Sequence, residues 1–172
     1  MATFNTAAKT LVIRRTFDLI FTPQQKENMN TSAVWSRTYP ARSITVYSGV
    51  QPTAQQVEAN WGSYKSSNSS CLAHYSSGVT FGYNDATLTY YFTNTSNAIT
   101  TTALNSGTAT WAIIWSASSV DVSLTSIPAS SKFVVVPVTN TAGVGIIRYS
   151  NLVATQGQAF APYDGGLSLL EV

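Results

Sequence analysis

The side chains able to act as nucleophiles or general bases are few in this chain, and the first to consider is its one histidine. His74 stands in the stretch Cys71-Leu72-Ala73-His74-Tyr75, which is typical of a strand with His74 on its outer face and Cys71 as a small buried residue. A Ser-His-Asp triad needs a serine held beside the histidine, and the sequence has no Gly-x-Ser-x-Gly turn. A hydrolase that uses His74 beside a serine or two acids stays open as one hypothesis.

Acidic and metal-binding residues give no clearer sign of catalysis. A glycosidase needs two carboxylates that face one cleft, and a calcium-binding hand needs an Asp-rich loop. One histidine and one cysteine cannot complete a zinc site within one chain, and a single cysteine forms no intrachain disulfide. The sequence therefore predicts no catalytic residue, no metal ligand and no cofactor, and a chain that is not an enzyme. The seven acids are dispersed: Asp18, Glu27, Glu58, Asp85, Asp121, Asp164 and Glu171.

Aromatic side chains offer a different chemistry, the stacking of sugar rings. The chain has four tryptophans and nine tyrosines. Trp111 and Trp115 share one face of an expected strand over residues 108–115, two pleats apart. Packing in the core is the preferred interpretation of this pair. An exposed aromatic face at Trp111 and Trp115 would instead predict a carbohydrate-binding module, which stays as an alternative.

The composition is that of a β protein with a hydroxyl-rich surface. Charged residues make up 9% of the chain, against about 25% in an ordinary globular protein, while Thr and Ser number 23 and 22. Thr favours strands and Ser favours turns. A net charge of +2 repels other copies weakly, so association is easy and a homo-oligomer is expected. Seven of the nine basic residues lie before residue 66 without forming a run, so no specific nucleic-acid partner is predicted.

The pattern along the chain predicts one all-β domain. A polar arm over residues 1–10 precedes the domain, 11–172, which begins with strict alternation from Leu11 to Phe21, typical of a long half-buried strand. Pro52 followed by Ala54, Val57 and Trp61 at helical spacing predicts one helix over 52–60. About nine or ten strands are expected in all, among them 43–48, 71–75, 79–83, 87–93, 108–115, 120–124 and 132–138.

Turn signals every eight to twelve residues favour an antiparallel β-sandwich or jelly roll over a parallel sheet. No apolar stretch is long enough to span a bilayer. The pair Arg14-Arg15 precedes no apolar segment of the length an export signal needs. We therefore expect a protein without a membrane partner and without an export signal.

Four segments carry a resemblance to a known group of proteins. The stretch Ile44-Thr45-Val46-Tyr47-Ser48-Gly49-Val50-Gln51-Pro52-Thr53-Ala54 resembles a pattern found in small virion proteins of tailed phages. Leu72-Ala73, Gly78-Val79-Thr80-Phe81 and Gly107-Thr108-Ala109-Thr110-Trp111 follow in the order seen in those proteins, so the resemblance covers residues 43–115. It implies an all-β virion component and supplies no catalytic residues.

Three functions follow as expectations. The first is a head decoration or cement protein that binds the outer capsid lattice, with a tail, neck or fibre-attachment component as its close variant. Other virion proteins, such as the major capsid protein, would be its partners. The second is the carbohydrate-binding module and the third is the hydrolase. Contacts to an acidic capsid surface are expected from four arginines, for which ordinary surface charge is the alternative: Arg14, Arg15, Arg37 and Arg42.

Overall fold

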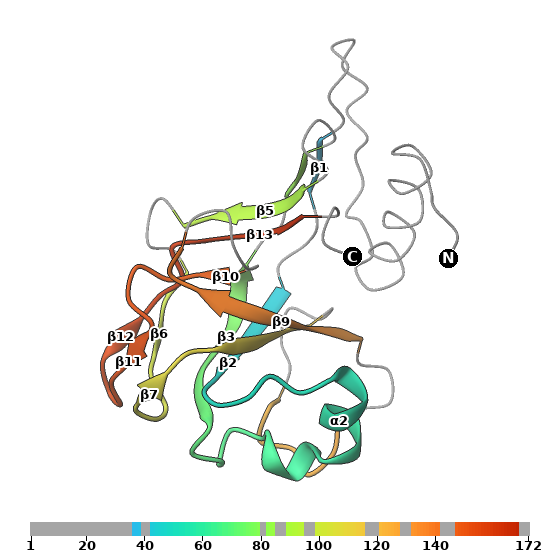
Figure 1. The fold of residues 1–172 in the computed structure, drawn as a ribbon, viewed down its shortest axis with the longest axis vertical. Helices are drawn as coiled ribbons and strands as arrows, with labels where there is room; N and C mark the ends of the chain where they lie inside the picture. The colour runs from blue at the N-terminus through green and yellow to red at the C-terminus, as the bar shows by residue number, and fades with distance from the viewer. Residues whose placement is uncertain are drawn as a thin grey trace.

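The structure, a computed structural model, consists mainly of strands (Figure 1). It describes residues 36–38, 42–79, 82–84, 89–94, 99–115, 121–127, 132–141 and 147–168. The expected arm and the strand over 11–21 lie outside the described residues. The elements are β1 (Ser36–Thr38), β2 (Arg42–Tyr47), α2 (Ala54–Ala59), the 3-10 turn η1 (Trp61–Ser63), β3 (Cys71–Val79), β4 (Gly82–Asn84), β5 (Thr89–Thr93), β6 (Thr101–Thr102), β7 (Gly107–Thr108), β8 (Trp111–Trp115), β9 (Phe133–Thr139), β10 (Ile147–Arg148), β11 (Val153–Ala154), β12 (Ala159–Phe160) and β13 (Asp164–Ser168).

Nine of these strands form one curled sheet in the order β1-β4-β5-β13-β10-β9-β8-β2-β3, and two short pairs, β11-β7 and β12-β6, lie beside it (Figure 1). The predicted all-β class is confirmed, and the sandwich or jelly roll stays a prediction. One pairing departs from the expected antiparallel pattern, because β10 runs parallel to β9. Only two residues of each strand pair there, Val138 with Ile147 and Thr139 with Arg148, so the long crossover of an extended parallel pair is not needed.

Two neighbouring strands of the sheet, β2 over residues 43–47 and β8, are buried on both faces. All five residues of β8 are buried, and β2 pairs with β8 so that Tyr47 faces Trp111 and Thr45 faces Ile113. Alternation then puts Trp111, Ile113 and Trp115 on one face, as the sequence predicted, and Ala112 with Ile114 on the other. Each face packs into a hydrophobic cluster of its own.

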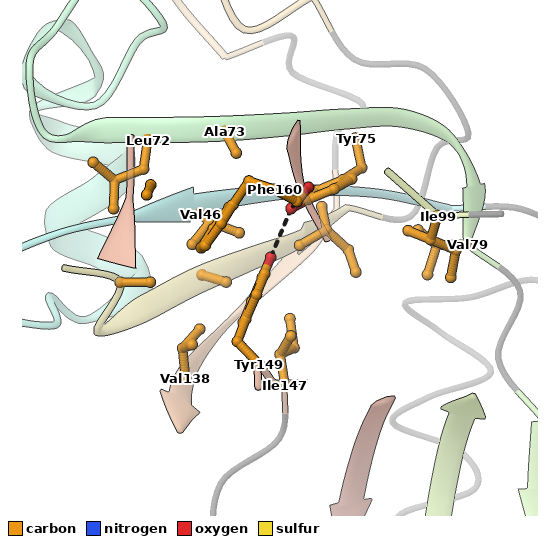
Figure 2. Close-up of a cluster of buried hydrophobic side chains, with 14 of the residues drawn as sticks. Val46, Leu72, Ala73, Tyr75, Val79, Ile99, Val138, Ile147, Tyr149 and Phe160 are labelled. Carbon is orange, nitrogen blue, oxygen red and sulfur yellow. Dashed lines mark hydrogen bonds between the residues drawn. The ribbon is translucent and has the colours of Figure 1, made fainter. Parts of the chain in front are cut away.

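The first cluster lies on the face of Val46 and Ala112, under β6, β7, β11 and β12. Its centre is a pair of buried phenols (Figure 2). The Tyr149 hydroxyl donates to the Tyr75 hydroxyl at 3.0 Å, and the Tyr75 hydroxyl donates to the carbonyl oxygen of Phe160 at 2.8 Å. The Tyr149 ring also stacks on the Phe160 ring with centroids 4.4 Å apart. Both hydroxyls are therefore satisfied inside an apolar cluster.

The helix expected over 52–60 is confirmed as α2. Thr53 is its N-cap: its hydroxyl accepts from the Gln56 amide at 3.2 Å, and the Gln56 side chain accepts from the Thr53 amide at 2.8 Å. This reciprocal pair is a capping box and fixes where the helix begins.

Several expected strands have other bounds in the structure, and the strand expected over 108–115 is divided into β7 and β8. Residues 120–124 were expected to form a strand, but the structure has turns and bends over 121–127, because the Asp121 carboxylate accepts from the Ser123 amide at 2.9 Å and closes a local turn. The expected strands at 71–75 and 79–83 differ as well, since β3 runs on to Val79 with irregular register against β2. Within the described ranges no helix is long and apolar enough to cross a membrane.

Gly107 of β7 lies close to the side chain of Leu72 in β3. A Cβ built on Gly107 would lie 2.9 Å from Cδ2 of the fully buried Leu72. We expect Gly107→Ala to lower the free energy of unfolding by about 1–3 kcal/mol, because Leu72 has little room to move. Urea unfolding followed by circular dichroism measures this loss. Gly62→Ala is the matched control, since a Cβ there meets nothing within 4 Å, and equal effects of the two substitutions would contradict the explanation.

Candidate functional site

The one histidine is part of a buried polar chain on the second face of the sheet. The Thr45 hydroxyl oxygen lies 2.8 Å from His74 Nδ1 and accepts a hydrogen bond from Trp115 Nε1 at 2.9 Å. An indole N–H can only donate, so the hydroxyl hydrogen of Thr45 remains for another acceptor. His74 Nδ1 can accept it in the tautomer that carries its proton on Nε2.

The Thr45–His74 contact has the form of a nucleophile beside a base, but its position differs from that of a catalytic pair. Thr45 is fully buried, and its oxygen is already engaged by Trp115. The structure therefore places the half-buried histidine beside a buried threonine hydroxyl, and the hydrolase stays a prediction. The expected position of His74 on the outer face is wrong, because Thr45 pairs with it across β2 and β3 and fixes it on the face of Trp115.

The predicted aromatic face is buried. Trp111 and Trp115 are 1% and 0% exposed. The Trp111 ring stacks on Tyr47 with centroids 4.1 Å apart, and its Nε1 donates to the carbonyl oxygen of Ser48 at 3.2 Å. A ring covered on this face by Tyr47 has no open surface for a sugar, so the prediction of a glycan platform at Trp111 and Trp115 is wrong for this conformation. Core packing, the preferred interpretation, is confirmed.

The cover over this face consists of α2, η1 and residues 121–127. Trp61 meets Trp115 edge to face, with centroids 5.6 Å apart, and its Nε1 donates to the carbonyl oxygen of Leu124 at 2.9 Å. The Ser66 amide donates to the carbonyl oxygen of Val122 at 2.8 Å. The indole thus joins two segments far apart in sequence. Helical spacing predicted only that Trp61 lies near α2, and nothing in the sequence indicated its partner.

The arginines predicted as contact residues are only partly placed. Arg37 lies in β1 and Arg42 at the start of β2, two strands that are not neighbours in the sheet order. Arg14 and Arg15 lie outside the described residues. The four arginines therefore stay an untested prediction.

A charged pair that the sequence did not single out joins β10 to β13. Arg148 Nε donates to Asp164 Oδ1 at 2.8 Å, a second guanidinium nitrogen meets Asp164 Oδ2, and the guanidinium carbon lies 4.4 Å from the ring centroid of Tyr163. The Asp164 carboxylate raises the pKa of Arg148. Both side chains are about a quarter to a third exposed, so the pair fastens two strands at the surface and contributes modestly to stability. No group of three or more metal-ligating side chains occurs in the part of the chain that the structure describes.

Burial controls the ionisation of several weak acids in the core. It raises the pKa of Cys71 to about 12, and it raises the pKa values of Tyr47, Tyr75 and Tyr149 above the ordinary tyrosine value. The Cys71 thiol is therefore neutral and weakly reactive at physiological pH.

The Thr45 hydroxyl can be tested by an isosteric change. Thr45→Val leaves the Trp115 indole N–H and the His74 ring buried without their shared partner, so we expect a loss of about 1–3 kcal/mol in unfolding free energy. Thr102→Val, at an exposed strand position, is the control and should change stability by less than about 0.5 kcal/mol. Chemical denaturation of the purified chain measures both. A Thr45→Val protein as stable as the wild type would show that the Thr45 hydroxyl does not contribute to stability.

The four buried acids predict alkaline instability. A group whose pKa is raised on folding keeps its proton in the native state while the unfolded chain loses it, so stability is full below the unfolded pKa and falls above it. We expect stability to decline above about pH 9, by up to about 1.4 kcal/mol per pH unit for each such group. Absorbance at 295 nm should show a fraction of the nine tyrosines ionising only when the protein unfolds. Ionisation of all tyrosines without loss of structure would contradict the burial of these phenols.

Three of the segments that carry the phage resemblance, residues 44–54, 72–73 and 107–111, contact one another. Thr110 donates from its amide to the carbonyl oxygen of Tyr47 at 2.9 Å and from its hydroxyl to that of Gly49 at 2.6 Å. Gly49 has a φ of 91°, a backbone angle that favours glycine, and Gly107 packs on Leu72. These residues thus form a turn and contacts between strands. Comparison of the chain with protein-family models, curated proteins and solved structures found no match.

Proposed function

We propose that the chain is a structural protein of a tailed-phage virion, in the first place a decoration or cement protein on the outer capsid lattice. The observation that carries the proposal is the ordered set of segments from Ile44 to Trp111 that resembles small phage virion proteins. A tail, neck or fibre-attachment component is the variant within the same class. Its partners would be other virion proteins and further copies of itself.

The character of the domain supports a role in assembly. β2 and β8 pack on both faces, and close packing of this kind fixes their place in the sheet. Low charge suits a surface that is covered by neighbours in its working state, since copies do not repel one another. The Thr45–His74 pair and the four buried acids Cys71, Tyr47, Tyr75 and Tyr149 take part in the packing of the two clusters.

Imaging of the particle tests the proposal. Purified particles of the phage that encodes the chain should contain it in stoichiometric amount by mass spectrometry. Cryo-electron microscopy should resolve its curled sheet on the head or the tail. Copies in the hundreds would assign it to the capsid lattice, and a single ring of copies would assign it to the neck or tail. Particles that carry no copy would overturn the proposal.

Charge reversal at the predicted arginines tests the expected contact with the capsid lattice. Particles stripped of the protein should rebind the recombinant chain. A variant with Glu at positions 14, 15, 37 and 42 should bind roughly tenfold or more weakly, because charge reversal opposes an acidic lattice. Lys132→Glu, at an exposed position on the loop before β9, is the control. Equal binding of both variants would show that the four arginines do not contribute to binding.

A further inference from the structure

The ion pair between β10 and β13 lies on a part of the sheet that is distant from α2. β5 and β13 lie at the opposite end of the molecule from that helix (Figure 1). Arg148 pairs with Asp164 across the two strands, and cross-strand partners share one face of the sheet. On the other face Ile147 and Phe92 are buried in the first cluster. The face of Arg148 and Asp164 is therefore the one that reaches solvent here.

The ring of Tyr163 is held in place beside this pair. The Tyr163 amide donates to the carbonyl oxygen of Arg148 at 2.7 Å, and its own carbonyl oxygen accepts from the Asn94 amide at 3.1 Å. One face of the ring lies against the guanidinium, whose carbon is 4.4 Å from the ring centroid. Tyr163 is nevertheless 55% exposed, so the opposite face of the ring is open to solvent. A ring fixed in this way needs little ordering when a ligand stacks on it.

A second exposed tyrosine lies on the same face. Tyr91 in β5 is two residues from Thr93, the partner of Asp164, so Tyr91 occupies the diagonal position, roughly 7–8 Å from Asp164 between backbones. Glycines stand opposite Tyr91 on both neighbouring strands, Gly82 in β4 and Gly166 in β13. No cross-strand side chain therefore flanks Tyr91, which is 42% exposed.

The ion pair itself can make further hydrogen bonds. A guanidinium carries more N–H groups than the two that Arg148 directs to Asp164, and a carboxylate has more lone pairs than the two that Asp164 uses. Both side chains are partly exposed, at 25% and 32%. The pair thus places donors and acceptors side by side at the surface while its two charges balance each other.

This combination of groups favours a neutral sugar over other ligands. The C–H bonds of a sugar carry slight positive charge and pack on the negative face of an aromatic ring. Its neighbouring hydroxyls donate and accept, which matches a carboxylate beside a guanidinium. An anion would be repelled by Asp164 and a cation by Arg148. An apolar ligand would remove water from the ion pair and offer no hydrogen bond in exchange.

We propose that Tyr163, Tyr91 and the Arg148–Asp164 pair form a binding site for a neutral saccharide. The sugar stacks on the open face of Tyr163, its hydroxyls bind the ion pair, and Tyr91 borders the site. The contact is small, so a single short saccharide binds with a Kd on the order of 1 mM, and several copies held together bind a glycan surface more tightly. The site is separate from the buried Trp111 and Trp115, and it goes beyond the virion proposal without resting on it.

Saturation-transfer NMR on the full-length chain tests the site with three neutral probes, maltotriose, lactose and mannotriose. At least one probe should bind with a Kd on the order of 1 mM. Tyr163→Ala should weaken its binding about three- to tenfold, while Tyr163→Phe, which keeps the ring, should stay within about twofold of the wild type. Val50→Ala, at a residue 93% exposed on the turn after β2, is the control and should leave binding unchanged.

Arg148→Lys tests the part played by the ion pair. Lysine keeps the positive charge but loses the planar fork of N–H groups, so the same probe should bind several-fold more weakly. Near-ultraviolet circular dichroism should show an unchanged aromatic core in each variant.

Three results would overturn the proposal. The first is that no neutral probe binds at about 10 mM, and the second is that Tyr163→Ala binds as well as the wild type. The third is binding of sialyllactose without binding of lactose, which would assign the site to anions held by Arg148. Particle imaging decides the virion proposal separately, because a virion protein need not bind sugars.

Discussion

The pairing of β2 with β8 is the constraint on which the rest of the structure depends. Both strands are buried on both faces, so each of their side chains must fit one of two clusters. A shift of one residue in their register would move Trp111 and Trp115 into the cluster now filled by alanine and isoleucine, and would break the hydrogen bond between Trp115 and Thr45. Packing of side chains on both faces of the sheet therefore fixes the register of β2 against β8.

The strand β8 and the helix α2 could be predicted from the sequence, whereas the segments that pack around them could not. Alternation at Trp111, Ile113 and Trp115 predicts a strand and one shared face, and Pro52 with the residues after it predicts α2. Alternation does not say which face is covered when both are, so the histidine was assigned to the wrong side. Val122 and Leu124 follow the period of a strand, but the carboxylate of Asp121 turns the chain locally.

The two-residue strands β6, β7, β11 and β12 were beyond prediction for another reason. Their partners lie about fifty residues apart, and two residues are too few to show an apolar period.

The residues that carry the resemblance to phage virion proteins have structural roles. Gly49 lies in a turn, Gly107 lies against Leu72, and the Thr110 amide donates to the carbonyl oxygen of Tyr47. These contacts explain part of the fold and do not identify a partner.

The division of aromatic residues between the two clusters has a spectroscopic consequence. Three of the four tryptophans, Trp61, Trp111 and Trp115, lie in the second cluster, while the first is built around phenols and aliphatic side chains. Emission from these three indoles therefore reports on the face under α2, while Tyr75 and Tyr149 report on the face under β6, β7, β11 and β12. The order in which the signals of these two groups of rings change would reveal which side of the sheet opens first.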